Sequence, residues 1–144
     1  MTPSLLSLML IILIAWFLLP LVLRQLQVRH LECLCATGRS IVLTYDDGPS
    51  PETTSALLDL LTQREVPATF FVIGSRAEAN PDLVSRLLLA GHEIGNHTQS
   101  HLNAWKTWPL AAVRDIRVGR QTLARLGVPP GRFRPPYGLS LIHI

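Results

Sequence analysis

The segment from Leu5 to Leu23 restricts the architecture of this chain more than any other feature, because it is long, apolar and free of charged residues. As a helix it would span about 28 Å at about 1.5 Å per residue, close to the roughly 30 Å hydrocarbon core of a membrane. No lysine or arginine precedes it and no small-x-small sequence ends it, although a cleaved signal peptide needs both. We therefore predict an uncleaved, single-pass transmembrane anchor over residues 1–24, with a buried core helix or a signal peptide as the alternatives.

The basic residues bear on membrane orientation and on binding partners. Arg24, Arg29 and Arg39 follow the apolar segment and no basic residue precedes it, which by the positive-inside rule would place the rest of the chain in the cytoplasm. The formal net charge is +3, but the 13 lysines and arginines are scattered and form no basic run. We therefore expect no nucleic-acid partner.

After a predicted linker over residues 25–38, short apolar runs alternate with helical patterns. This alternation favours right-handed βαβ crossovers and a parallel sheet, in which reactive groups collect at the carboxyl ends of the strands. Helices are expected from Pro51, Pro81 and Pro109, and strands over residues 41–45, 68–73 and 93–97 and from Phe133.

Two adjacent acids, Asp46 and Asp47, follow the first predicted strand in the sequence Asp-Asp-Gly-Pro. Neighbouring residues on extended backbone point in opposite directions. One carboxylate can therefore bind a metal while the other faces a different atom. The alternative is a simple turn with two solvated acids.

Two histidines, His97 and His101, stand four positions apart in the sequence His-Thr-Gln-Ser-His. On a helical turn this spacing brings both imidazoles to one side, where they can chelate a divalent ion. The alternative is that the pair lies on the protein surface and binds no metal. Together with one carboxylate, the pair would form a site that leaves coordination positions open for water and substrate, as hydrolysis requires.

A third motif, Arg-Pro-Pro-Tyr-Gly, begins at Arg134. The two prolines fix the backbone that follows the arginine. A guanidinium held in this way can stabilise a carboxylate by a charge-assisted hydrogen bond. The alternative is an arginine that merely enters a proline turn.

In this order, and each at a predicted strand end, the three motifs resemble those of the polysaccharide deacetylase family, the NodB homology domain of carbohydrate esterase family four. The resemblance covers Ser40 to Gly138. It implies an α/β fold of the (β/α) barrel type, distorted or incomplete. It also implies removal of N-acetyl groups from a polysaccharide or oligosaccharide, with O-acetyl esters as substrates of some relatives.

The resemblance further implies roles for individual residues. Asp46 matches the general base, Arg134 the residue that tethers it, and the backbone N–H of Tyr137 an oxyanion donor. The cofactor is a divalent metal, most often zinc. Its ligands are matched by Asp47, His97 and His101.

The family continues past the third motif with an acidic motif and a later histidine that protonates the leaving amine. We therefore expect residues 39–144 to be a deacetylase domain truncated at its C-terminus, with low turnover and with His143 no substitute for that histidine. The leading hypothesis is a membrane-anchored, metal-dependent deacetylase that faces the outside, where polymeric glycans are found. The rival is a membrane-anchored module that binds metal and glycan without turnover.

Overall fold

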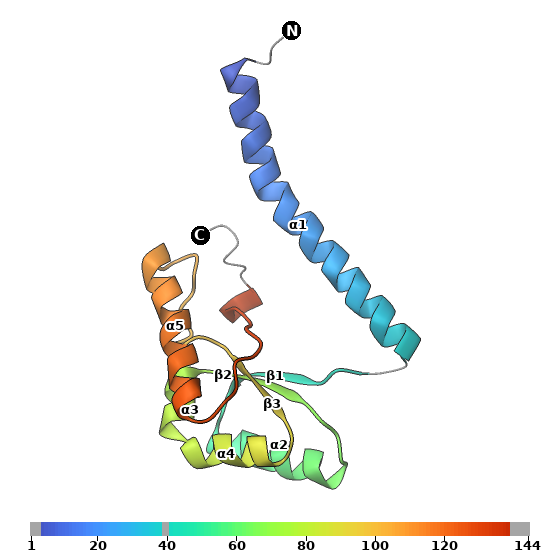
Figure 1. Ribbon diagram of the computed structural model, residues 1–144, viewed down its shortest axis with the longest axis vertical. Coiled ribbons are helices and arrows are strands. Elements are labelled where there is room, and N and C mark those ends of the chain that lie inside the picture. Colours follow the sequence, from blue (N-terminus) through green and yellow to red (C-terminus); the bar gives the residue numbers. More distant parts are fainter. Residues whose placement is uncertain (1–3, 39–40, 139–144) are drawn as a thin grey trace. The chain divides into compact units, whose positions relative to one another are not determined.

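The structure, a computed structural model, describes residues 4–38 and 41–138 (Figure 1). The chain divides into two compact units, the first ending at Ile41 and the second beginning at Val42. The predicted anchor belongs to the first unit, and all three motifs belong to the second. His143 falls outside the described residues.

Among the described residues of the first unit there is one helix, α1 (Leu5–Gly38). By length and composition this helix could cross a membrane. It runs without a break through residues 25–38, the predicted linker, so this stretch is a helical continuation of the apolar segment. The reason is local, because these residues include many good helix formers and no glycine or proline before Gly38.

The second unit is built on a parallel three-stranded sheet in the order β1 (Thr44–Gly48), β2 (Thr69–Val72) and β3 (Glu93–Asn96). Helix α2 (Pro51–Gln63) connects β1 to β2, while α3 (Gly74–Ala79) and α4 (Pro81–Leu89) connect β2 to β3. Helix α5 (Pro109–Arg125) follows β3, and a short 3₁₀ turn, η1 (Pro136–Gly138), ends the described chain. The prediction of a parallel α/β fold is confirmed.

Two strands differ from their predicted positions. The first runs from Thr44 to Gly48 rather than over residues 41–45, because its pairing starts where Thr44 meets Thr69, the first residue of β2. Asp46 and Asp47 therefore lie within this strand and not in a turn after it. The expected fourth strand is reduced to a single parallel bridge between Phe133 and Asn96. Its growth is blocked by the prolines that follow Arg134, which cannot donate to a ladder.

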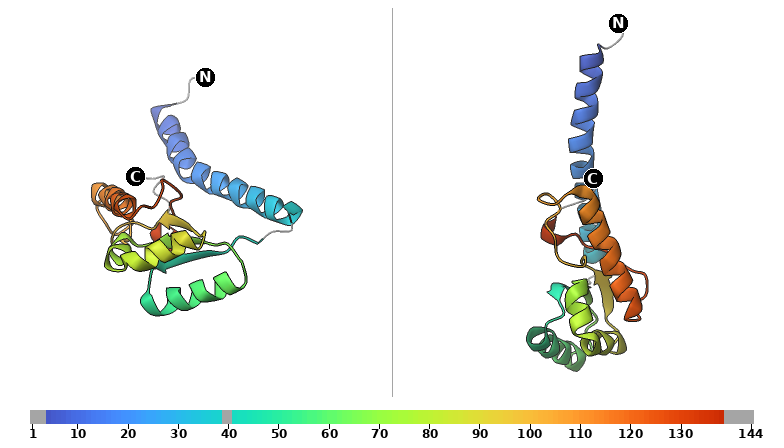
Figure 2. Two further views of the ribbon diagram at one scale, coloured as in Figure 1. Left: turned by 60° about the horizontal axis from the view of Figure 1, so that its bottom comes forward. Right: turned by 90° about the vertical axis from the view of Figure 1, so that its left-hand side faces the viewer.

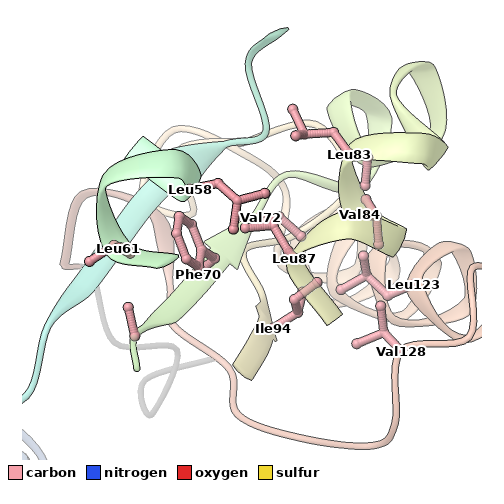
Figure 3. Packing of buried hydrophobic residues seen from close by; sticks show 12 residues of the cluster. Leu58, Leu61, Phe70, Val72, Leu83, Val84, Leu87, Ile94, Leu123 and Val128 are labelled. Carbon is pink, nitrogen blue, oxygen red and sulfur yellow. The ribbon is translucent and has the colours of Figure 1, made fainter. Parts of the chain in front are cut away.

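One hydrophobic core joins the sheet to its helices (Figure 3). Helices α2 and α4 lie on the same side of the sheet (Figures 1 and 2), and their apolar stripes face the strands. Full burial of one large apolar side chain contributes about 1.5–3 kcal/mol to the free energy of folding. The core residues include Leu58 and Leu61 of α2, Phe70 and Val72 of β2, Leu83, Val84 and Leu87 of α4, Ile94 of β3, and Leu123 and Val128.

The core also contains an ionisable side chain, His92. Its Nδ1 accepts a hydrogen bond from the Ala68 N–H at 3.3 Å, and its ring meets Phe70 edge-on with 5.4 Å between centroids. Nδ1 is therefore an acceptor in a neutral ring, and Nε2 is buried without a hydrogen-bond partner among the described residues. Burial lowers the pKa of His92 from its ordinary value of 6.5.

We predict that this histidine makes the second unit sensitive to acid. Since its pKa is lower in the folded than in the unfolded state, its contribution to stability is full above about pH 6.5 and is lost as the pH falls further. His92→Gln keeps an acceptor for the Ala68 N–H but does not ionise. Thermal unfolding of both proteins at about pH 7.5 and pH 5.5 should give a smaller acid-induced drop in the variant. Equal drops would contradict this account.

Candidate active site

The two acids of the first motif are separated by an irregularity in β1. The register is regular from Thr44 to Asp46, then skips Asp47 and resumes where Gly48 pairs with Val72. Asp47 has a positive φ of 65°. This β-bulge turns the Asp47 side chain away from the face that regular alternation would give it.

Asp46 keeps the regular alternation and shares a face of the strand with Thr44. One guanidinium nitrogen, Nη1 of Arg134, donates to Asp46 Oδ1 at 2.7 Å and to Thr44 Oγ1 at 3.0 Å. The same guanidinium stacks on the ring of Phe71, with its Cζ 4.1 Å from the ring centroid. Phe71 is the cross-strand partner of Asp46. The pairing of β1 with β2 therefore places Arg134, which lies over the Phe71 ring, next to the Asp46 carboxylate.

Asp47 faces the two histidines of the second motif. Its Oδ1 lies 2.9 Å from His101 Nε2 and 3.3 Å from His97 Nε2. One ligand atom from each of the three residues lies within 4.8 Å of the others. Two tetrahedral zinc ligands, each about 2.0–2.1 Å from the ion, stand about 3.3 Å apart. The donor set and its spacing therefore fit a divalent metal.

The ring of His97 is held in the orientation that such a ligand needs. His97 is buried, and its Nδ1 lies 2.7 Å from the carbonyl oxygen of Arg134. A proton on Nδ1 leaves the lone pair of Nε2 directed toward Asp47 and His101. Metal-bound histidines are commonly oriented by a carbonyl in this way.

The histidines do not share a helical turn, which corrects the geometry expected from their spacing. Residues 97–101 form a loop after β3. Thr98 and His101 have positive φ values of 69° and 55°, and the Thr98 hydroxyl accepts a hydrogen bond from the His101 N–H at 3.0 Å. The left-handed residues fold the loop back on itself, and this brings the rings to 5.1 Å between centroids.

Tyr137 lies beside this cluster, in η1. Its ring centroid is 4.8 Å from that of His101, and its backbone has a positive φ of 58°. The structure thus brings together all six residues that the three motifs suggested, namely Asp46, Asp47, His97, His101, Arg134 and Tyr137.

One contact at the site could not be anticipated from the motifs. The guanidinium of Arg76 donates a hydrogen bond to the backbone carbonyl of Asp47. Arg76 lies on α3, a six-residue helix that is too short to give a periodic pattern in the sequence. The backbone carbonyl of the bulged residue, Asp47, is therefore held by a side chain that lies outside the three motifs.

Comparison with known proteins identifies the family. The family model described as polysaccharide deacetylase matches residues 34–141. The chain belongs to the polysaccharide deacetylase family. It is 46% identical over 98 residues to a peptidoglycan-N-acetylglucosamine deacetylase of Bacillus cereus, covering 68% of this chain and 46% of that protein. It is 43% identical over 104 residues to a chitooligosaccharide deacetylase of Bradyrhizobium, covering 70% and 47%.

Solved structures agree with the sequence relatives. A family 4 carbohydrate esterase from Streptomyces lividans superposes with a TM-score of 0.65 at 37% identity, covering 69% of this chain and 52% of that one. The peptidoglycan deacetylase PdaC from Bacillus subtilis gives a TM-score of 0.65 at 40% identity, covering 67% and 48%. This chain therefore spans about half the length of the relatives it matches.

We predict that the ion pair of Arg134 serves orientation more than stability. Both partners are more than one-third exposed, at 36% and 38%, and such pairs contribute about 0–1 kcal/mol. Arg134→Gln should therefore lower the free energy of unfolding by about 1 kcal/mol or less. Phe71→Ala, which removes a buried ring beneath it, should cost about 3–5 kcal/mol. Denaturant unfolding in detergent measures both, and comparable losses would contradict the prediction.

Proposed function

We propose that this protein is a metal-dependent hydrolase that removes N-acetyl groups from a polysaccharide or oligosaccharide. The observation that carries the proposal is that two neighbouring acids face different partners. Asp46 is paired with Arg134, and Asp47 faces His97 and His101. Relatives named as deacetylases of peptidoglycan and of chitooligosaccharides support an acetylated glycan as the substrate class.

In the proposed reaction, water attacks the acetyl carbonyl carbon, the C–N bond breaks, and the products are acetate and a free amine. Asp46 accepts the proton of the attacking water, and the Arg134 guanidinium keeps this carboxylate aimed at it. The backbone N–H of Tyr137 donates to the oxygen that becomes negative. Protonation of the leaving nitrogen needs a further acid, which we assign to none of the described residues.

The metal, for which zinc is our choice, would be held by Asp47, His97 and His101. When bound, it supplies a Lewis acid and lowers the pKa of a coordinated water. The carbonyl of Arg134 fixes the His97 ring for this task. Arg134 thus orients the proposed base, Asp46, through its side chain and the proposed metal ligand His97 through its backbone carbonyl.

We predict that His97→Ala abolishes stoichiometric zinc binding, because two remaining ligands leave an open, weakly held site. His30→Ala, on the exposed surface of α1, is the matched control and should keep the metal. Metal analysis of purified protein after dialysis gives the ratio of zinc to chain. Unchanged zinc in His97→Ala would refute the ligand assignment.

Asp46→Asn separates the base from the ligands. Joined to the remainder of the domain found in its full-length relatives, the variant should retain zinc, since Asp46 contacts Arg134 and Thr44. It should lower acetate release from N-acetylated chitooligosaccharides by about 10²–10⁴-fold. Loss of metal with retained activity would mean that the two acids are assigned the wrong way round. If the completed domain without the substitution binds zinc and glycan but releases no acetate, the rival function, a non-catalytic binding module, is favoured.

We further propose that α1 anchors the protein in a membrane, with the second unit on the extracytoplasmic side where polymeric glycans occur. The length and apolar composition of α1 support the anchor. In sealed inside-out vesicles, the second unit should resist added protease until detergent opens the membrane. Digestion without detergent would place it in the cytoplasm, as the arginines after Leu23 favour.

A further inference from the structure

Helix α5 contributes a buried acid to the loop that carries both histidines. Asp115 is only 9% exposed, although aspartate is seldom buried in proteins. Its Oδ2 accepts a hydrogen bond from the Ser100 N–H at 3.1 Å, and its backbone carbonyl accepts one from the Gln99 N–H at 3.1 Å. Burial of an acid is costly unless hydrogen bonds compensate it. The Ser100 N–H provides that compensation to the carboxylate.

A second residue ties the same loop to Ile116, the residue that follows Asp115 in the helix. Asn96 Nδ2 donates to the carbonyl of Ile116 at 3.0 Å, while Asn96 Oδ1 accepts from the Thr98 N–H at 3.0 Å. With the bond from the His101 N–H to the Thr98 hydroxyl, each amide from Thr98 to His101 has an acceptor. Asp115 supplies two of these four acceptors.

The helix backbone also touches the loop directly. At Gly119, an added Cβ would come within 2.6 Å of the Thr98 carbonyl carbon and 2.8 Å of the Gln99 nitrogen. These atoms belong to the backbone and cannot rotate away as a side chain would. Gly119 therefore allows α5 to approach closely enough for Asp115 to reach Ser100.

We infer that Asp115 is a positioning residue for the metal site, acting through the loop between the two histidines. This inference rests on the proposed function. Thr98 and His101 hold left-handed conformations, which for residues other than glycine persist only where surrounding contacts impose them. From α5, Asp115 holds the two residues between them, Gln99 and Ser100. Removing its carboxylate leaves the three ligands in the chain but releases the backbone that sets the distance between His97 and His101.

The test compares zinc affinity, by competition with a chromophoric chelator, in the full chain and its variants. Asp115→Ala should weaken zinc binding by about 10–100-fold, the range typical of residues that orient ligands. Asp115→Asn, whose side-chain oxygen can still accept from the Ser100 N–H, should bind within a few-fold of wild type. Thr122→Ala, at a buried α5 position that bonds Arg125 and not the loop, is the control for general loss of stability.

A second pair of variants tests the same contact from the backbone. Gly119→Ala should also weaken zinc binding, because its methyl group pushes the loop from α5. Gly131→Ala should leave it unchanged, since the nearest atom to an added Cβ there is 3.5 Å away. This pair keeps the test decisive if Asp115→Ala does not fold.

The outcomes separate the inference from the function on which it rests. A wild-type chain without zinc affinity overturns the proposed metal site, and the inference falls with it. A wild-type chain that binds zinc, together with unchanged affinity in folded Asp115→Ala or Gly119→Ala, overturns the role of Asp115 alone. An equal loss in Thr122→Ala also overturns it, since instability would then account for the effect.

Discussion

The chemistry proposed for this site depends on the bulge that separates two neighbouring acids. In an unbroken strand, Asp47 would share the face of Tyr45, which stacks on Phe70 at 5.3 Å between centroids and packs against the core. The shift in register sends the Asp47 carboxylate to the histidines instead, while Asp46 stays with Arg134. One change in backbone direction therefore gives two identical side chains two different environments.

The two halves of the site are joined through Arg134. Its guanidinium holds Asp46, and its carbonyl oxygen accepts from the His97 ring. The arginine is itself placed by Phe71, whose ring lies so close to Gly95 that an added Cβ there would fall 2.6 Å from it. A side chain at position 95 would displace the ring and the arginine above it. The position of Arg134 in the polar site thus depends on how Phe71 packs against Gly95.

The sequence predicted what depends on local patterns and failed where long-range pairing decides. Apolar periodicity located α2, α4 and α5, and the order of strands and motifs predicted that the six motif residues lie near one another, while the roles given to them stay predictions. The start of β1 was wrong, because propensity favoured Ile41 and Val42 while pairing with β2 decides where the strand begins. The helical geometry expected of the histidine pair was wrong as well. Spacing alone does not reveal the positive φ angles that hydrogen bonds from outside the motif sustain.

The position of β1 in the sheet has a consequence for what surrounds the two acids. Within the part of the chain that the structure describes, β1 pairs with β2 alone, so its opposite side presents backbone donors and acceptors that can recruit another strand. A strand added there would lie directly beside Asp46. The acid stands at a border of the sheet, and the solvent access and polarity that it experiences are set by whichever chain segment completes that border.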